Sequence, residues 1–196
     1  MEQKRCNMMT ALNTSPGILP RDIQTPLDSQ VMADFGIGDT LVLSGVIYAG
    51  RDVALPKLVK LIESGGLDAA GIVLAGAVIF HTAVSPAGVG PTSSNKYDIE
   101  SSIPALSRAG VKIHIGKGRL SEETIAALAE YNSVYAIVPP VTALLESRIV
   151  ERRVAAFPEA GMEALHVLRV EGFPCMVAAA HGRTMADLNA SEDARS

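Results

Sequence analysis

The chain has 196 residues, a formal net charge of −4 at pH 7 and an apolar content of 48%, enough to fill one core without a disulfide or a structural metal. Its 17 Lys and Arg residues are scattered, only 4% of residues are aromatic, and tryptophan is absent. A surface that binds nucleic acid needs clustered basic groups and usually aromatic rings that stack on bases. Nucleic acid is therefore not an expected partner.

Cysteine usage argues against a metal centre held by this chain alone. The two cysteines, Cys6 and Cys175, are far apart in the sequence, and neither belongs to a CxxC pair. A [4Fe–4S] cluster generally takes about four thiolate ligands. We therefore expect neither a zinc site nor a self-contained cluster, and unpaired cysteines suit a reducing cytoplasm.

Membrane insertion and secretion are not expected either. The longest apolar run, at 69–80, is interrupted by Gly71 and Gly76 and is shorter than the ~20 residues that span a bilayer. The basic start at 1–5 is followed by no apolar segment of the kind found in signal peptides. We expect a cytoplasmic protein without membrane contact.

The first half of the chain predicts two strands and a helix after a polar tail at residues 1–20, which we expect to be flexible. Residues 40–48 are β-branched and apolar and follow a Gly-Ile-Gly-Asp turn, which predicts a strand. Residues 54–63 place leucines on one helical face and predict a helix. The apolar stretch at 71–81 predicts a second buried strand or a pair of strands.

The second half of the chain continues the alternation of expected strands and helices. Ser102 can cap a helix that has Pro104 in its first turn and ends before Gly110. Residues 111–115 alternate between apolar and polar side chains, which is typical of a half-buried strand. The remaining expected elements are a helix at 122–131 capped by Ser121, strands at 134–138, 164–170 and 176–179, and a flexible C-terminal tail at 186–196.

These elements predict one domain at residues 21–185. Strands and helices are mixed but keep no strict βαβ rhythm, so the expected fold is α/β with a mixed sheet in a layered β/β/α arrangement.

Three polar segments each follow an expected strand, where loops commonly carry function. They are Ala49–Asp52, Gly90–Lys96 and Gly116–Arg119. Each combines small residues with at least one cation, and Lys or Arg side chains can hold carboxylates. Together the three loops could form a receptor for a small dianion.

Taken singly, each segment also has an ordinary structural interpretation. Arg51 can be a charge beside a helix start, Thr92 and its neighbours can form a turn with hydroxyl-to-backbone bonds, and Lys117 can be a solvated turn residue. The glycine spacing around Lys117 does not match a phosphate-binding P-loop. His81 and His114 lie close to apolar strands, and we expect them in the core or at its rim.

The order of the segments resembles the β region of class I fumarases and L-tartrate dehydratases. Gly90-Pro91-Thr92-Ser93-Ser94 is followed some twenty residues later by Gly116-Lys117-Gly118, a combination that is fairly specific to this family. The resemblance is also carried by the stretches from Gly38 to Asp52 and from Val170 to Pro174, and it runs from about Gln24 to about Arg183.

This resemblance implies a swivelling β/β/α domain that closes over a cluster-bearing α region, here expected to be a separate α subunit. The family reversibly hydrates or dehydrates small dicarboxylic acids, of the fumarate/malate or tartrate/oxaloacetate type, at a [4Fe–4S] cluster that the partner would carry. This chain would then be a hydro-lyase β subunit that is active only with an α subunit; pairing of two β chains also stays open. Carried over by motif, Thr92 takes part in proton transfer, and Arg51, Ser93, Lys96 and Lys117 bind substrate.

The sequence departs from the family pattern at several positions. Lys96 stands where the family usually has Arg, Leu55 where it has His, and Pro139-Pro140 where it has Gly-Gly or Ala-Gly. Lysine keeps the charge but loses the planar two-pronged contact with a carboxylate. These changes leave open an alternative, a non-catalytic or divergent paralogue that binds a dicarboxylate or has a regulatory role.

Overall fold

The computed structural model describes residues 19–86, 88–90 and 100–187 of the chain. The described strands are β1 (Arg21–Thr25), β2 (Thr40–Gly50), β3 (Val78–His81), β4 (Ile113–Gly116), β5 (Val134–Ile137), β6 (Ile149–Ala156), β7 (Leu165–Ala180) and β8 (Arg183–Thr184). The α-helices are α1 (Ala54–Glu63), α3 (Ile103–Arg108), α4 (Glu122–Glu130) and α5 (Thr142–Glu146), with 3-10 helices η1 (Val31–Asp34) and η2 (Pro158–Glu163).

The central strands form a closed ring. Strands β2, β3, β4 and β5 are neighbours and run parallel. The 16-residue strand β7 runs antiparallel to β5 on one edge and to β2 on the other, so it joins the two ends of the parallel set. The remaining strands extend this ring: β1 pairs with the first half of β2, β6 with the first half of β7, and β8 with its end.

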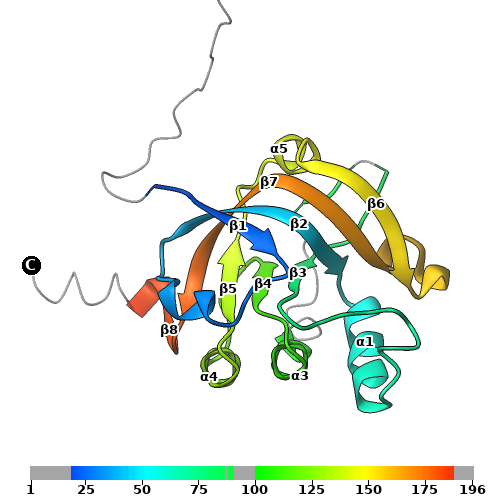
Figure 1. Ribbon diagram of the computed structural model, residues 1–196, viewed down its shortest axis with the longest axis horizontal. Helices are drawn as coiled ribbons and strands as arrows, with labels where there is room; N and C mark the ends of the chain where they lie inside the picture. Colours follow the sequence, from blue (N-terminus) through cyan, green and yellow to red (C-terminus); the bar gives the residue numbers. More distant parts are fainter. Residues whose placement is uncertain (1–18, 87, 91–99, 188–196) are drawn as a thin grey trace, which may run out of the picture.

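The structure is layered (Figure 1). Helices α1, α3 and α4 lie on one side of β3, β4 and β5, and the strongly curved pair β6 and β7 lies with β2 on the opposite side. The prediction of a mixed α/β chain with a sheet is confirmed.

Apolar side chains fill the interior of the ring. Two of its phenylalanines, Phe80 of β3 and Phe173 of β7, are fully buried and meet edge to face with ring centroids 5.7 Å apart. Alternate residues point outward to a second cluster, where Ile79 of β3 packs with Leu55 and Leu58 of α1. Because both faces of β3 are covered, the strand is apolar throughout rather than alternating.

This double coverage corrects one prediction. Residues 111–115 were expected to form a half-buried strand because Lys112 and His114 interrupt the apolar run, but every residue of β4 is buried. His114 is covered by α3, which it contacts through Ser107. Lys112 precedes the strand, and its Nζ donates a hydrogen bond to the Tyr131 carbonyl at 2.8 Å.

Two other predicted boundaries were wrong. Of the stretch 71–81, only the last four residues form a strand, because Gly71 and Gly76 have positive φ and a Cβ on Gly76 would collide with the Leu27 carbonyl. The strands expected at 164–170 and 176–179 are one strand, since β7 continues through Gly172 in the left-handed region.

Other predictions were accurate. Helix α1 has the predicted limits, β2 extends the predicted strand by two residues, and Ser121 caps α4 by accepting a hydrogen bond from Thr124 N at 3.3 Å. Ser102 is the N-cap of α3, but it makes no side-chain cap bond. Strands β1, β6 and β8 and helix α5 were not predicted. Most of both tails, 1–20 and 186–196, lies outside the described residues, so the domain limits stay a prediction.

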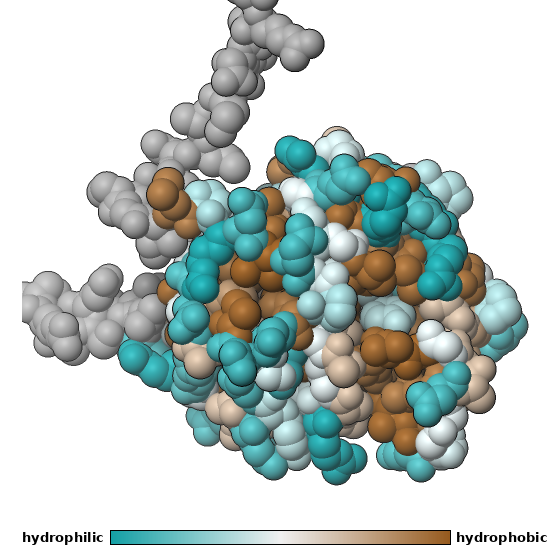
Figure 2. All heavy atoms as spheres, in the orientation of Figure 1, coloured by the Kyte–Doolittle hydropathy of each residue, from teal (hydrophilic) through white to brown (hydrophobic). Residues whose placement is uncertain are grey.

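The described surface mixes polar and apolar side chains. Figure 2 shows apolar residues reaching the surface over the region of α1, and among the exposed large apolar residues are Val53 at its start and Val73 in the loop that follows. No helix among the described residues is long and apolar enough to cross a bilayer.

The ring interior predicts a large stability effect at Phe80. Replacing Phe80 with Ala should lower the free energy of unfolding by roughly 3–5 kcal/mol, because a fully buried aromatic ring leaves a cavity that its neighbours fill only in part. The matched change Val154→Ala, at a side chain 45% exposed on β6, should cost about 0.5 kcal/mol or less. Urea unfolding measures both, and equal losses would show that the ring interior is not the core.

Candidate functional site

The predicted loops begin at one edge of the parallel sheet. Gly50 at the end of β2 pairs with His81 at the end of β3, and Phe80 pairs with Ile115, so continuing the register places Gly116 beside His81. Neighbouring strands are about 4.8 Å apart, which puts the ends of β2 and β4 roughly 10 Å apart. Ligands of parallel sheets bind at the carboxyl ends of the strands.

Two of the predicted site residues lie within the described chain at this edge. Arg51 directly follows β2 and Lys117 directly follows β4, where its side chain is exposed. Thr92, Ser93 and Lys96 lie outside the described residues. Their assignment therefore stays a prediction, as do the roles of Arg51 and Lys117.

The start of the middle loop is tied to the end of β3. Thr82 is fully buried, and its hydroxyl donates a hydrogen bond to the Gly90 carbonyl at 2.6 Å. Its backbone N–H donates to the Gly50 carbonyl at 3.2 Å. Gly90, the residue before the Pro91-Thr92 motif, is thus fixed close to the end of β2, which Arg51 follows.

The Arg51 guanidinium is held by a carboxylate of the same chain. Its Nε donates to Glu163 Oε1 at 2.8 Å, and its Nη2 also contacts that oxygen. The two side chains are 21% and 25% exposed, so the pair is partly shielded from water. Glu163 ends η2, and no sequence pattern indicates that this residue, 112 positions away, contacts Arg51.

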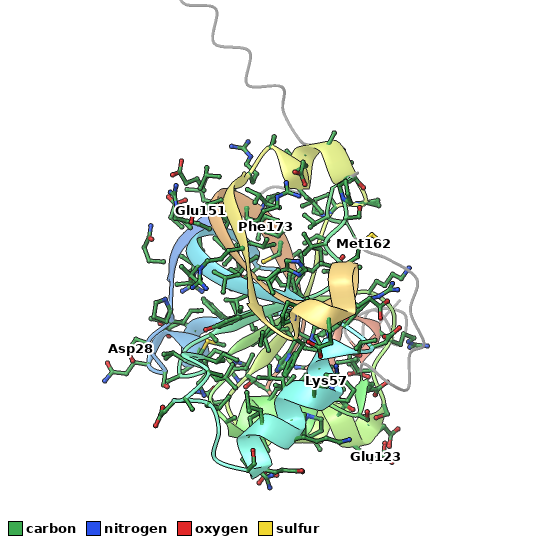
Figure 3. The ribbon with its side chains drawn as sticks, turned by 90° about the vertical axis from the view of Figure 1, so that its right-hand side faces the viewer. Asp28, Lys57, Glu123, Glu151, Met162 and Phe173 are labelled. Carbon is green, nitrogen blue, oxygen red and sulfur yellow. The ribbon has the colours of Figure 1, made fainter. Side chains whose placement is uncertain are left out.

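Further contacts hold η2 against the ends of the strands. Val84 N donates to the Met162 carbonyl at 3.0 Å, and Lys57 of α1 pairs with Glu159 at 2.6 Å. The Lys57 ammonium also lies 5.5 Å from the centre of the Phe157 ring. Figure 3 shows η2, with Met162 labelled, above α1 and Lys57. Segment η2 therefore lies beside Arg51, which it contacts through Glu163.

A tyrosine explains why glycine precedes Lys117. A Cβ on Gly116 would lie 2.5 Å from the Tyr135 hydroxyl, so no other residue fits without movement. Burial, with a smaller contribution from the charge of Glu100, raises the pKa of Tyr135, and the phenol stays protonated. Glu100 in turn accepts a hydrogen bond from Ser121 N at the start of α4. These contacts position the backbone from which Lys117 projects.

A buried histidine pair lies beneath the same edge. His81 Nε2 and His114 Nδ1 are 3.1 Å apart, and His114 Nε2 is 2.9 Å from Ser107 Oγ. Burial lowers the pKa of His81 to about 3, and burial together with the charge of His81 lowers the pKa of His114. Both rings are therefore neutral near pH 7 and belong to the core, one of the two expected placements.

The described residues do not fit a resident iron–sulfur cluster. Cys175 is buried in the ring, and burial raises the pKa of its thiol to about 12, far from the thiolate that binds iron. Within the described ranges, His, Cys, Asp and Glu side chains form no group of three or more that could hold a metal ion. Cys6 lies outside those ranges.

Comparison with known proteins shows the protein family to which the chain belongs. The family described as Fumarase C-terminus matches residues 8–186, and the chain belongs to this family.

Named relatives agree with that class. The chain is 27% identical to the L(+)-tartrate dehydratase subunit beta of Escherichia coli (strain K12), over 83% of this chain and 85% of the relative. It is 26% identical to Fumarate hydratase 2 of Leishmania major and 29% identical to the anaerobic class I fumarate hydratase of Escherichia coli (strain K12), over 80% and 74% of this chain. It spans less than a third of those two relatives, 29% and 28% of their lengths.

The contact between Gly116 and Tyr135 predicts a rescue. Gly116→Ala alone should destabilise the fold by about 1–3 kcal/mol, because the new methyl group overlaps the buried phenol oxygen. The double variant Gly116→Ala with Tyr135→Phe, which removes that oxygen, should recover a large part of the loss. Thermal and urea unfolding of the three variants measures the coupling; strictly additive effects would contradict the contact.

The histidine pair predicts a loss of stability in mild acid. Both pKa values are lower in the folded than in the unfolded state, so the unfolded chain binds more protons once the pH falls below about 6.5. The free energy of unfolding should fall by about 1.4 kcal/mol per pH unit for each neutral histidine between pH 6 and 5. His81→Gln should reduce this slope by about 1.4 kcal/mol per pH unit, which is the contribution of one histidine. A slope equal to that of the unaltered chain would show that His81 is not held neutral.

Proposed function

We propose that this chain is the substrate-binding β subunit of a hydro-lyase that reversibly hydrates or dehydrates a small dicarboxylic acid, of the fumarate/malate or tartrate/oxaloacetate type. The observation that carries the proposal is the meeting of the Arg51 and Lys117 loops at the carboxyl edge of one parallel sheet, in a chain of the Fumarase C-terminus family. Its coverage of a tartrate dehydratase beta subunit supports the same role.

The chain would supply half of the site. We assign it the swivelling β/β/α fold of the family, closing over an α subunit that holds the [4Fe–4S] cluster. We do not expect this chain to bind the cluster through Cys175, because Cys175 is a buried thiol with a raised pKa. Activity would then require the α subunit, in a hetero-oligomer expected in the cytoplasm.

The cations would bind the substrate carboxylates. Arg51 and Lys117 flank the carboxyl ends of β2 and β4, and Lys96 would extend the set from the middle loop. Removal of a proton beside a carboxylate builds negative charge on that group, which fixed cations stabilise without reorganisation during the reaction. Ser93 would add a hydrogen bond to the bound acid.

Thr92 would move the proton at the substrate carbon. An alcohol is a poor base by its own pKa, so this role needs a nearby cation and a partner group. The hydrogen bond from Thr82 to Gly90 supports the assignment, because it fixes the start of the Thr92 loop at the end of β3, close to the residue before Arg51.

The alternative is a divergent paralogue that binds a dicarboxylate without turnover. One observation favours it: Leu55, where the family has a histidine, lies in the first turn of α1 and is fully buried in the core. A group at this position takes part in packing and offers no polar atom. The alternative predicts binding without turnover even beside an α subunit.

Lys117 provides the test of the binding site. In the complex with a candidate α subunit, Lys117→Gln should raise the KM for L-malate or L-tartrate by roughly ten- to hundred-fold, because a charge-assisted hydrogen bond to a carboxylate is lost. The control Lys60→Gln, at an exposed lysine on α1, should leave KM unchanged. An unchanged KM in the Lys117 variant would contradict the site.

Thr92 separates catalysis from binding. Thr92→Val removes the hydroxyl at nearly constant volume, so the complex should bind the same acid and lose at least about a hundred-fold in kcat, as expected for a group that transfers a proton. Steady-state kinetics with the complex measures both parameters. Binding of the acid by the unaltered complex without any turnover would favour the paralogue, and turnover by the lone, metal-free chain would exclude the need for an α subunit.

A further inference from the structure

Strand β6 has one paired edge and one open edge. It pairs with β7, and its backbone pairs with no other strand in the part of the chain that the structure describes. Figure 1 shows β6 at the outer margin of the molecule. All five residues from Val150 to Val154 are exposed. An open edge of this kind presents backbone N–H and C=O groups with which a strand of another chain can pair.

The centre of this open strand carries charges of opposite sign. Glu151 meets Arg169 of β7 at 3.4 Å, but these side chains are 60% and 49% exposed, and such an ion pair contributes little to stability. Figure 3 shows Glu151 at the surface of the molecule. Arg153 forms no hydrogen bond or ion pair with any residue that the structure describes. Both charges are therefore available to a partner.

These two charges share one face of β6. Residues 151–154 pair with β7 without a break in register, so their side chains alternate between the two faces of the sheet. Glu151 and Arg153 lie on one face, and Arg152 lies on the other. There Arg152 forms an ion pair with Glu146 of α5, which neutralises its charge within the chain.

We propose that β6 pairs antiparallel with β6 of a second copy of this chain, with Arg152 at the twofold axis. In this dimer, Glu151 of each copy lies opposite Arg153 of the other copy. The contact is isologous, because the same residues of both copies form it, and it closes after two subunits. It does not depend on the proposed function.

The alternation of side chains selects this register. Two antiparallel strands related by a twofold axis set residues opposite each other only when these lie on the same face. An axis at Glu151 would set two glutamates opposite each other, and an axis at Arg153 would do the same with two arginines. Like charges directly opposite destabilise a strand pair, whereas opposite charges stabilise it. An axis at Arg152 forms two pairs of opposite charge and leaves each Arg152 with its own Glu146.

The same register gives two exposed valines a partner. Val150 and Val154 are 44% and 45% exposed, and the axis at Arg152 sets Val150 of one copy opposite Val154 of the other. Contact between them removes apolar surface from water. Charges on an edge strand also serve to prevent pairing, but here the sequence of charges and valines complements itself in one register.

Charge reversal tests the contact by sedimentation equilibrium of the full chain. Glu151→Arg and Arg153→Glu should each weaken dimerisation at least about ten-fold, because each turns both pairs of opposite charge into pairs of like charge. An equimolar mixture of the two variants should recover the affinity of the unaltered chain to within about three-fold, because every pair in the mixed dimer is again of opposite sign. The control Glu63→Arg, at an exposed glutamate of α1, makes the same change in net charge and should leave dimerisation unchanged.

A thiol at the twofold axis tests the register. In a Cys6→Ser background, Arg152→Cys should be cross-linked by mild oxidation with diamide, because opposite residues of antiparallel strands have Cα atoms about 5 Å apart, within reach of a disulfide. Arg153→Cys should not be, because its Cα would lie roughly 8 Å from its counterpart.

Three outcomes would overturn the inference. One is an unaltered chain that stays monomeric at about 1 mM. Another is a dimer that neither single charge reversal weakens, or that mixing the two variants does not restore. The third is cross-linking of Arg153→Cys as readily as Arg152→Cys, which would place the axis elsewhere.

Discussion

Closure of the sheet by β7 is the constraint on which the rest of the structure depends. One strand of 16 residues pairs with β2 along one edge and with β5 along the other, and so fixes the parallel strands as a ring. The ring has an apolar interior centred on Phe80 and Phe173, and its outer face packs under α1. With both faces covered, the strands have little freedom to shift in register, because a shift by one residue would exchange the two faces.

The fixed register of β2, β3 and β4 brings the three loops that follow these strands close together. The end of β2, the end of β3 and the end of β4 lie in one row, so Arg51, the loop that begins after Thr82, and Lys117 leave the sheet side by side. The neutral pair His81 and His114 lies in β3 and β4, with His81 at the end of β3 within the same row. The pair stays uncharged because burial would strip a histidinium of its hydration, which costs free energy.

The sequence predicted the elements whose signals are local. The limits of α1 and the Ser121 cap of α4 follow from leucine spacing and a hydroxyl before acidic residues, and both are seen. What the sequence could not supply depends on tertiary contacts. Strand β4 is fully buried only because α3 covers it, and the 71–81 stretch is cut short by the approach of Gly76 to Leu27. The contact of Glu163 with Arg51 spans 112 residues, and no periodicity indicates it.

We propose that the carboxyl edge of the parallel sheet is half of a dicarboxylate site. The most direct measurement is a titration of the nitrogen-15-labelled chain with L-malate and L-tartrate, following every backbone amide. We expect shifts concentrated at residues 50–52, 81–82 and 116–118, with the amino ends of the same strands unaffected. Shifts confined to the opposite edge of the sheet, or none at millimolar acid, would contradict it.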